Sequence, residues 1–229
     1  VSTFILYKKF IPIFQIYLID KPNLRSLHKF NSPTGGGIIF AILISIFSVF
    51  KANYIPLFSL PLSIIGLLDD KKNLSRKIRI IGQLMTIIIF LSYGFYLNNI
   101  LPWIDLDMIY ILILPIIFCS LGIINFLNFS DGINGLLAGS LLVTFIYYTF
   151  NINTDFIFLI PIIFVFLYFN WSPAKIFMGD SGSLYLGALY VYILLSSSSL
   201  NQILYLIFIL SPILFDVLIT LLRRLFNNY

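Results

Sequence analysis

The chain has 229 residues, of which 60 % are hydrophobic, 17 % are aromatic and only 10 % are charged, and its mean hydropathy is +1.02. These values exclude a soluble globular domain and indicate an integral membrane protein. The net charge of +5 does not indicate a nucleic-acid partner, because the basic residues stand in short segments between apolar runs, where membrane topology explains them.

Apolar runs follow one another along the chain, and each compares with the roughly 20 residues that cross a bilayer. They cover residues 4–19, 38–50, 54–68, 78–97, 108–124, 135–150, 156–169, 184–195 and 203–222. We therefore expect an all-α polytopic membrane protein of about nine transmembrane helices, in a single domain over residues 1–229. Because the chain begins with Val rather than Met, we expect either that the sequence is a fragment or that its first spanning segment has lost its outer end.

Basic residues are distributed unequally between the two alternating sets of connections. One set holds Lys21, Arg25, Lys29, Lys71, Lys72, Arg76, Lys77, Arg79, Lys175, Arg223 and Arg224, and the other holds Lys51 alone. Since cytoplasmic connections carry the excess of Lys and Arg, the first set is expected in the cytoplasm. All candidate chemistry falls on or near that side.

The first polar motif is the run NSPTGGGIIF, Asn31 to Phe40, which includes Thr34. Glycines allow a backbone to approach a phosphate closely, so this segment is a candidate substrate-binding loop. The alternative is a flexible entry into a membrane helix.

The second motif is the pair Asp69-Asp70, which closes an apolar run just before KKNLSRKIR. Carboxylates are unfavourable at the C-terminal end of a helix, where the dipole is negative. A divalent cation or the bases between Lys71 and Arg79 would compensate them. The alternative is a solvated helix end.

The third motif is NFLNFSDGING, in which Asn125, Asn128 and Asp131 are spaced by three, followed by Asn134. If the helix continues, the first three share one face. Polar groups at this depth are costly and usually face a polar cavity, although an ordinary polar connection is the alternative.

The fourth motif, NWSPAKIFMGDSGSLYLG, contains Lys175, Phe177 and Asp180. Small residues around an Asp at a helix start admit phosphate or water to the backbone N–H groups, and the carboxylate can hold Mg²⁺. The alternatives are a simple N-cap for Asp180 and an interfacial anchor for Phe177.

Together these groups favour phosphate chemistry with a hard cation at the membrane surface. The acidic residues are all Asp, and His28 is the only histidine, which rules out a multi-histidine metal site. Mg²⁺, with Mn²⁺ as a substitute, prefers such oxygen ligands. One substrate can then be a lipid phosphate and the other a soluble nucleotide.

The four motifs, in this order between membrane segments, resemble the polyprenyl-phosphate N-acetylhexosamine-1-phosphate transferases of glycosyltransferase family 4. The resemblance runs from about Asp20 to Arg224. It implies transfer of a sugar 1-phosphate from a UDP-N-acetylhexosamine to polyprenyl (undecaprenyl) phosphate, with release of UMP. It also implies a bacterial plasma membrane enzyme that acts on the cytoplasmic face in cell wall or lipopolysaccharide synthesis, with a homodimer as an open alternative.

Residue roles carried over from the resemblance are as follows. Asp69 or Asp70 would deprotonate or position the lipid phosphate, and Asp131 and Asn128 would lie in the catalytic cleft. Asp180 would bind Mg²⁺ and Phe177 would stack on uracil. Apart from the resemblance, Lys175 and the bases from Lys71 to Arg79, including Arg76 and Arg79, are our own candidates for phosphate contacts. Thr34, Asn125 and Asn134 are further candidates for substrate binding.

The chain departs from the family pattern in two places. Many members have Asp at the position of Asn134, and the family carries a histidine-containing loop beyond the Arg223-Arg224 position, whereas this sequence stops at Tyr229. We therefore expect a C-terminal truncation. An ion-coupled transporter and an inactive truncated relative are the competing hypotheses.

Overall fold

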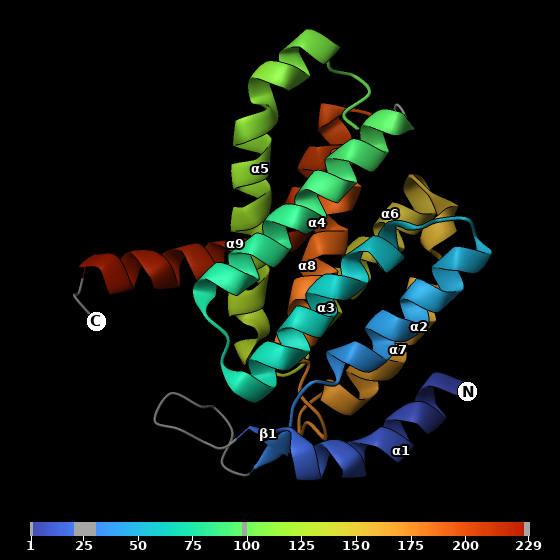
Figure 1. Ribbon diagram of the computed structural model, residues 1–229, viewed down its shortest axis with the longest axis vertical. Coiled ribbons are helices and arrows are strands. Elements are labelled where there is room, and N and C mark those ends of the chain that lie inside the picture. Colours follow the sequence, from blue (N-terminus) through green and yellow to red (C-terminus); the bar gives the residue numbers. More distant parts are fainter. Residues whose placement is uncertain (1, 21–30, 98–99, 227–229) are drawn as a thin grey trace.

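The computed structural model describes residues 2–20, 31–97 and 100–226 (Figure 1). Over this part of the chain it forms nine α-helices, two short 3₁₀ helices and one two-stranded antiparallel sheet. The elements are α1 (Ser2–Tyr17), β1 (Ile19–Asp20), β2 (Ser32–Pro33), α2 (Gly37–Phe50), α3 (Ile55–Lys72), α4 (Arg76–Tyr96), α5 (Leu106–Phe129), η1 (Ser130–Gly132), α6 (Leu136–Asn151), η2 (Thr154–Phe156), α7 (Leu159–Asn170), α8 (Asp180–Leu195) and α9 (Leu200–Phe226). Lys21, Arg25, His28 and Lys29 lie outside the described residues.

Each predicted apolar run corresponds to one of these helices, so the expected all-α fold is confirmed apart from the small β1–β2 pair. The helices that carry the polar motifs are longer than their apolar runs. Helix α3 continues through Asp69 and Asp70, α5 continues through Asn125 and Asn128, and α8 begins already at Asp180. The polar ends of these three helices therefore lie at one end of the helical bundle.

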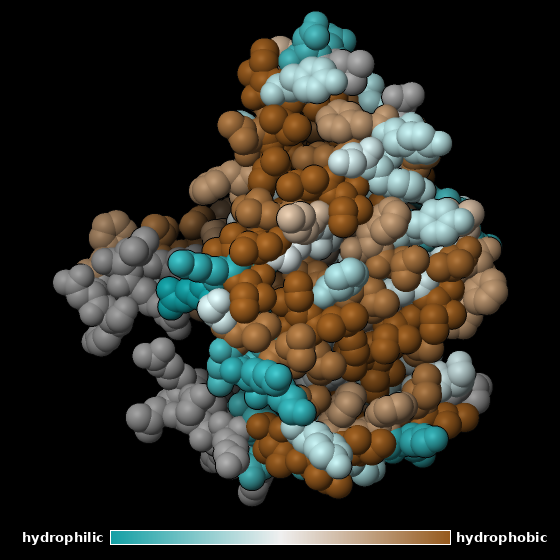
Figure 2. Space-filling view, in the orientation of Figure 1, coloured by the Kyte–Doolittle hydropathy of each residue, from teal (hydrophilic) through white to brown (hydrophobic). Residues whose placement is uncertain are grey.

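Three helical segments in the described ranges are long and apolar enough to cross a membrane: Arg76–Tyr96, Asp107–Gly132 and Leu200–Thr220. Several shorter apolar helices accompany them. The chain is thus a helical membrane protein, while nine transmembrane crossings stay a prediction. Figure 2 shows the apolar surface over α3, α4 and α5, with hydrophilic residues gathered near the end of α3 and the start of α4.

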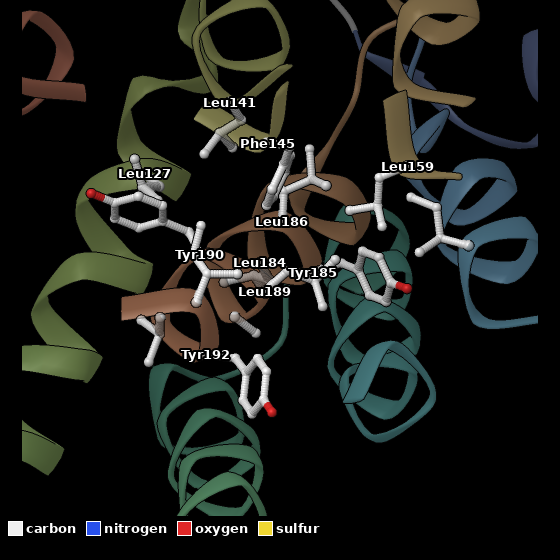
Figure 3. Packing of buried hydrophobic residues seen from close by; sticks show 14 of the residues in the cluster. Leu127, Leu141, Phe145, Leu159, Leu184, Tyr185, Leu186, Leu189, Tyr190 and Tyr192 are labelled. Atoms are coloured by element: carbon white, nitrogen blue, oxygen red, sulfur yellow. The ribbon is translucent and has the colours of Figure 1, made fainter. Parts of the chain in front are cut away.

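Helix α8 is the central element of the bundle. Every residue from Ser181 to Leu195 is buried. Apolar side chains from α5, α6 and α7 surround it, including Leu127, Phe145 and Leu159 (Figure 3). A helix that is apolar on all sides requires neighbours on all sides, and this one receives them.

Glycines bring α2 and α3 into close contact with α8. A Cβ at Gly182 would lie 2.8 Å from the Gly37 Cα, and one at Gly66 would lie 2.5 Å from the Ser181 nitrogen. The Ser63 hydroxyl adds a hydrogen bond of 2.7 Å to the Ser181 carbonyl. Small residues at helix crossings allow such backbone approach inside membranes.

Helix α9 contains Pro212, and its C-terminal half projects away from the bundle (Figure 1). Large apolar side chains on this half are exposed, among them Phe215 and Ile219. Exposed apolar side chains on a projecting helix are suited to contact with lipid.

Replacing Gly66 by Ala tests the α3–α8 contact. The added methyl group would meet the backbone of Asp180 and Ser181, which cannot move aside as a side chain would. We expect a loss of about 1–3 kcal/mol of unfolding free energy, as for other overpacked sites. The measurement is thermal or denaturant unfolding in detergent, with Gly122→Ala as the matched control.

The control is informative because a Cβ at Gly122, also within a helix, would meet nothing within 4 Å. Gly122→Ala should leave stability unchanged or slightly higher, since Ala is the better helix former. Equal stability of the two variants would contradict the tight α3–α8 crossing.

Candidate active site

A cavity of about 940 Å³ opens where β1, the end of α3, the start of α4, η1 and the α7–α8 connection meet. This is the lower end of the molecule in Figure 1. Its lining residues are Ile19, Asp20, Thr34, Asp69, Asp70, Asn73, Leu74, Arg76, Arg79, Asp131, Gly132, Ile133, Asn134, Ser172, Phe177, Gly179 and Asp180.

The cavity brings together residues from all four sequence motifs. Those among the predicted site residues are Asp69, Asp70, Asp131, Asp180, Asn134, Phe177, Thr34, Arg76 and Arg79. Segments that are far apart in sequence meet here because the polar ends of α3, α5 and α8 point to the same end of the bundle.

Asp70 joins the end of α3 to the beginning of α8. One of its carboxylate oxygens accepts a hydrogen bond of 2.9 Å from the backbone N–H of Asp180, and the other accepts one of 3.5 Å from that of Ser181. These N–H groups have no partner inside their own helix, and the positive end of the α8 dipole attracts the carboxylate. Asp70 therefore acts as a capping residue supplied by a different helix.

Arg79 compensates the two neighbouring carboxylates with one nitrogen. Its Nη1 lies 3.0 Å from Asp69 Oδ2 and 3.2 Å from Asp180 Oδ2. Asp69 also accepts a 2.6 Å hydrogen bond from the Leu74 backbone, which fixes the turn between α3 and α4. The bases predicted to balance the Asp pair thus include a direct ion-pair partner.

Asn128 holds the second oxygen of Asp180 from behind the cavity. Its Nδ2 donates to Asp180 Oδ1 and to the Ser183 hydroxyl, both at 2.8 Å. One carboxylate oxygen of Asp180 is thus paired with Arg79 of α4 and the other is hydrogen-bonded to Asn128 of α5. Its orientation is set by both neighbours.

Negative charge exceeds positive charge in the cavity. Five aspartates and two arginines are among the described residues that line it. The pKa of Asp70, which lies beyond the apolar part of α3, is raised to about 7, mainly by burial and also by the charges of Asp180 and Asp69, while the hydrogen bonds from the N–H groups of α8 oppose the shift. A bound cation would relieve this electrostatic cost.

Oxygen ligands make the cavity chemically suited to a hard cation such as Mg²⁺. However, in residues 2–20, 31–97 and 100–226 no three His, Cys, Asp or Glu side chains are arranged to hold a metal ion by themselves. Mg²⁺ commonly uses one or two carboxylates and completes its shell with water and substrate phosphate. The donor set fits that mode of binding, with Asp180 as the predicted ligand.

The glycine-rich segment before α2 forms one wall of the site by pairing with the α7–α8 connection. Phe177 N–H donates to the Pro33 carbonyl at 2.8 Å, and Gly36 N–H returns a bond of 2.9 Å to the Phe177 carbonyl. Gly179 has φ of +71°, and a Cβ there would clash with Asp70 and with the Thr34 hydroxyl. The loop can therefore close over Asp70 only with glycine at this position.

Three predicted residues lie outside the cavity lining: Asn128, which bonds to Asp180 from outside it, Asn125 and Lys175. Asn125 forms a reciprocal amide pair with Gln83 of α4, with bonds of 3.1 and 2.8 Å. The Lys175 ammonium lies 5.7 Å from the centre of the Tyr168 ring. The structure does not bring the Asn125 or Lys175 side chain to the cavity, so the substrate contacts of these two residues stay predictions.

Several residues of the site had no clear signal in the sequence. Asp20 and Ser172 line the cavity from connections, where position cannot be inferred from helical spacing. The Asn170 side chain accepts a hydrogen bond from the Gly135 N–H and donates one to the Ile176 carbonyl. These bonds join the segment before α6 to the connection between α7 and α8. A signal existed for Gln83, which stands one helical turn after Arg79 in an otherwise apolar run.

The fold and cavity define a helical membrane protein with an aspartate-rich pocket at one end of its bundle. Comparison with known proteins is consistent with this description and more specific. The model of the glycosyl transferase family 4 matches residues 52–198, and the chain belongs to this family.

Relatives carry two kinds of name. The phospho-N-acetylmuramoyl-pentapeptide-transferases of Dictyoglomus turgidum and Staphylococcus saprophyticus are 35 % and 33 % identical, over 69 % and 80 % of this chain and 57 % and 67 % of their own lengths. A "Probable undecaprenyl-phosphate N-acetylglucosaminyl 1-phosphate transferase" of Bacillus subtilis is 28 % identical, over 93 % of this chain and 66 % of its own length. The matches span about three fifths to two thirds of these relatives. Family membership favours a transferase over an ion-coupled transporter.

Substitution of Asp70 separates its role as a hydrogen-bond acceptor from its charge. Asp70→Ala leaves the first N–H groups of α8 without this partner, and we expect a loss of about 1–3 kcal/mol in unfolding free energy. Asp70→Asn keeps an acceptor oxygen and removes a carboxylate whose charged form is already disfavoured by burial, so it should be much better tolerated. Unfolding of both variants in detergent measures this, and equal losses would contradict the capping role.

The Gln83–Asn125 pair is tested by a double-mutant cycle. Gln83→Leu, Asn125→Leu and the double variant should show a coupling of about 0.6–1.7 kcal/mol, the range for interhelical hydrogen bonds in membranes. Additive losses would mean that the two amides do not stabilise each other. Asn128→Leu combined with Gln83→Leu is the control, because Asn128 bonds to Asp180 and Ser183 instead.

Proposed function

We propose that the protein transfers an N-acetylhexosamine 1-phosphate from a UDP-sugar to polyprenyl phosphate, forming a polyprenyl diphosphate sugar and releasing UMP. The observation that carries the proposal is the cavity itself, in which aspartates from α3, η1 and α8 meet Arg76 and Arg79 at the bundle end. The names of the relatives supply the reaction class.

In this reaction an oxygen of the acceptor phosphate attacks the phosphorus that bears the sugar. The bond from that phosphorus to the bridging oxygen of the diphosphate breaks, and the bridging oxygen leaves with UMP. A carboxylate of the cavity that first takes up the sugar phosphate is the two-step alternative. In both routes negative charge develops on the leaving phosphate, and preorganised positive charge stabilises it.

We assign a different role to each aspartate of the cavity according to the contacts it makes. Asp70 holds the α8 N-terminus, so we assign it the positioning of Asp180. Asp131, half-buried in the cavity wall, and Asp69 are then the candidates to position or deprotonate the acceptor phosphate. Asp180 would hold Mg²⁺, which would neutralise charge on the diphosphate when bound.

The nucleotide is assigned to the side of the cavity formed by Phe177. Its ring is partly exposed and is suited to stacking on uracil. Arg76 and Arg79 at the start of α4 would contact phosphate oxygens, with Thr34 and Asn134 on the opposite loops.

The side of the membrane follows from charge. The bases Lys71, Lys72, Arg76, Lys77 and Arg79 lie at the same end of the molecule as the cavity. Because Lys and Arg mark cytoplasmic connections, we place the cavity on the cytoplasmic face of a bacterial plasma membrane. There it can receive a soluble nucleotide sugar and begin a cell-envelope glycan.

The test is UMP release by the whole protein that contains this chain, supplied with UDP-N-acetylglucosamine, undecaprenyl phosphate and Mg²⁺. Wild type should release UMP only when both the lipid and Mg²⁺ are present. Asp131→Asn should lower the rate by about 10²–10⁴-fold, the range for loss of a positioned acid or base. The proposal would fail if no UDP-N-acetylhexosamine gave lipid-dependent UMP.

Asp155→Asn is the matched control. Asp155 is an exposed aspartate on η2, between α6 and α7, and it does not line the cavity. Its replacement removes the same charge from the protein and should leave the rate unchanged. Equal loss in the two variants would mean that Asp131 acts through overall charge or folding.

A further inference from the structure

A second, apolar groove lies between α3 and α4, with a volume of about 330 Å³. Its walls include Phe58, Pro61 and Ile65 from α3 and Ile78, Ile81 and Met85 from α4. The Thr86 hydroxyl, also in the wall, donates to the Gly82 carbonyl of its own helix. The Thr86 hydroxyl therefore already has an acceptor within its own helix, and the wall of the groove stays apolar towards a ligand.

Helical spacing puts two lysines beyond one end of the groove. On α3, Phe58, Pro61 and Ile65 are spaced by three and four residues, and Lys72 continues this row seven residues after Ile65. On α4, Lys77 stands four residues before Ile81, which in turn stands four before Met85. Lys72 lies roughly 10 Å along its helix from Ile65, taking the usual rise per residue. Both lysines are exposed.

The combination of an apolar groove with two bases at one end matches the two parts of an anionic phospholipid. We propose that the α3–α4 groove binds such a lipid from the surrounding bilayer, with an acyl chain along Ile65 and Ile81 and the phosphate at Lys72 and Lys77. Basic residues beside a membrane helix attract anionic head groups. This attraction adds to the free energy gained when the acyl chain of the lipid is buried in the groove.

The groove is separate from the catalytic cavity, which argues against its being part of the acceptor site. Arg76 and Arg79 line the cavity, whereas Ile78 and Ile81 line the groove, so the two sites lie on different faces of α4. Neither Lys72 nor Lys77 lines the cavity. A phosphate held by these lysines would therefore leave the catalytic aspartates accessible.

The head-group test compares the whole protein in nanodiscs of phosphatidylcholine alone or with phosphatidylglycerol added, without nucleotide or polyprenyl phosphate. Native mass spectrometry counts the phosphatidylglycerol molecules retained, and thermal unfolding measures the stabilisation. Wild type should retain phosphatidylglycerol and unfold at a higher temperature with it. Lys72→Gln combined with Lys77→Gln should weaken retention roughly tenfold or more.

Lys8→Gln combined with Lys9→Gln is the charge-matched control, because these two lysines are exposed on α1 away from the groove. The control should behave as wild type. Equal retention in both double variants, or equal loss in both, would overturn the assignment.

The chain-binding part has its own pair of variants. Ile81→Trp should narrow the groove and lower retention, whereas Ile80→Trp, at an exposed isoleucine of the same helix outside the groove, should not. Displacement of retained phosphatidylglycerol by one equivalent of polyprenyl phosphate would also overturn the proposal, since the groove would then belong to the acceptor. Both readouts are independent of transferase activity, so a failure here leaves the proposed reaction unaffected.

Discussion

The contact between the end of α3 and the beginning of α8 determines the geometry of the whole cavity. Asp70 accepts hydrogen bonds from the first N–H groups of α8, so the negative end of one helix meets the positive end of another. This contact requires close approach of the two backbones, which Gly66 and Gly179 permit. Because α8 is buried along its length, its N-terminus cannot shift without disturbing the bundle core.

From this contact follows the arrangement of charge. Once Asp180 is placed at the start of α8, Arg79 and Asn128 fix its two oxygens from either side. Burial, together with the charges of Asp180 and Asp69, raises the pKa of Asp70, so the excess of aspartates in the cavity carries an electrostatic cost. A site of this kind gains stability from a cation and a phosphorylated ligand together, and this is the chemistry we propose for it.

The sequence predicts much of this arrangement because alternating helices return every second connection to the same side of the membrane. That rule brings Asp69, Asp131 and Asp180 to one end of the bundle, as the structure has them. The finer expectation that Asn125 shares a face with Asp131 does not follow, since 3.6 residues per turn place positions six apart roughly 120° from each other. Helix α5 also ends at Phe129, so Asp131 belongs to the following 3₁₀ turn. Lys175 lies in a connection, where no periodicity indicates its direction.

Helix α4 connects the two sites that we propose. One face carries Arg79, which lines the cavity, and Gln83, which pairs with Asn125 of α5; another carries Ile78, Ile81 and the rest of the groove wall. Arg79 also pairs with Asp69 of α3, so the relative position of α3 and α4 sets both the depth of the groove and the distance between Arg79 and the carboxylates. A lipid chain bound between these helices would therefore contact the same helical hairpin that carries Asp69 and Arg79. The composition of the bilayer and the electrostatics of the cavity are in this way physically linked through one pair of helices.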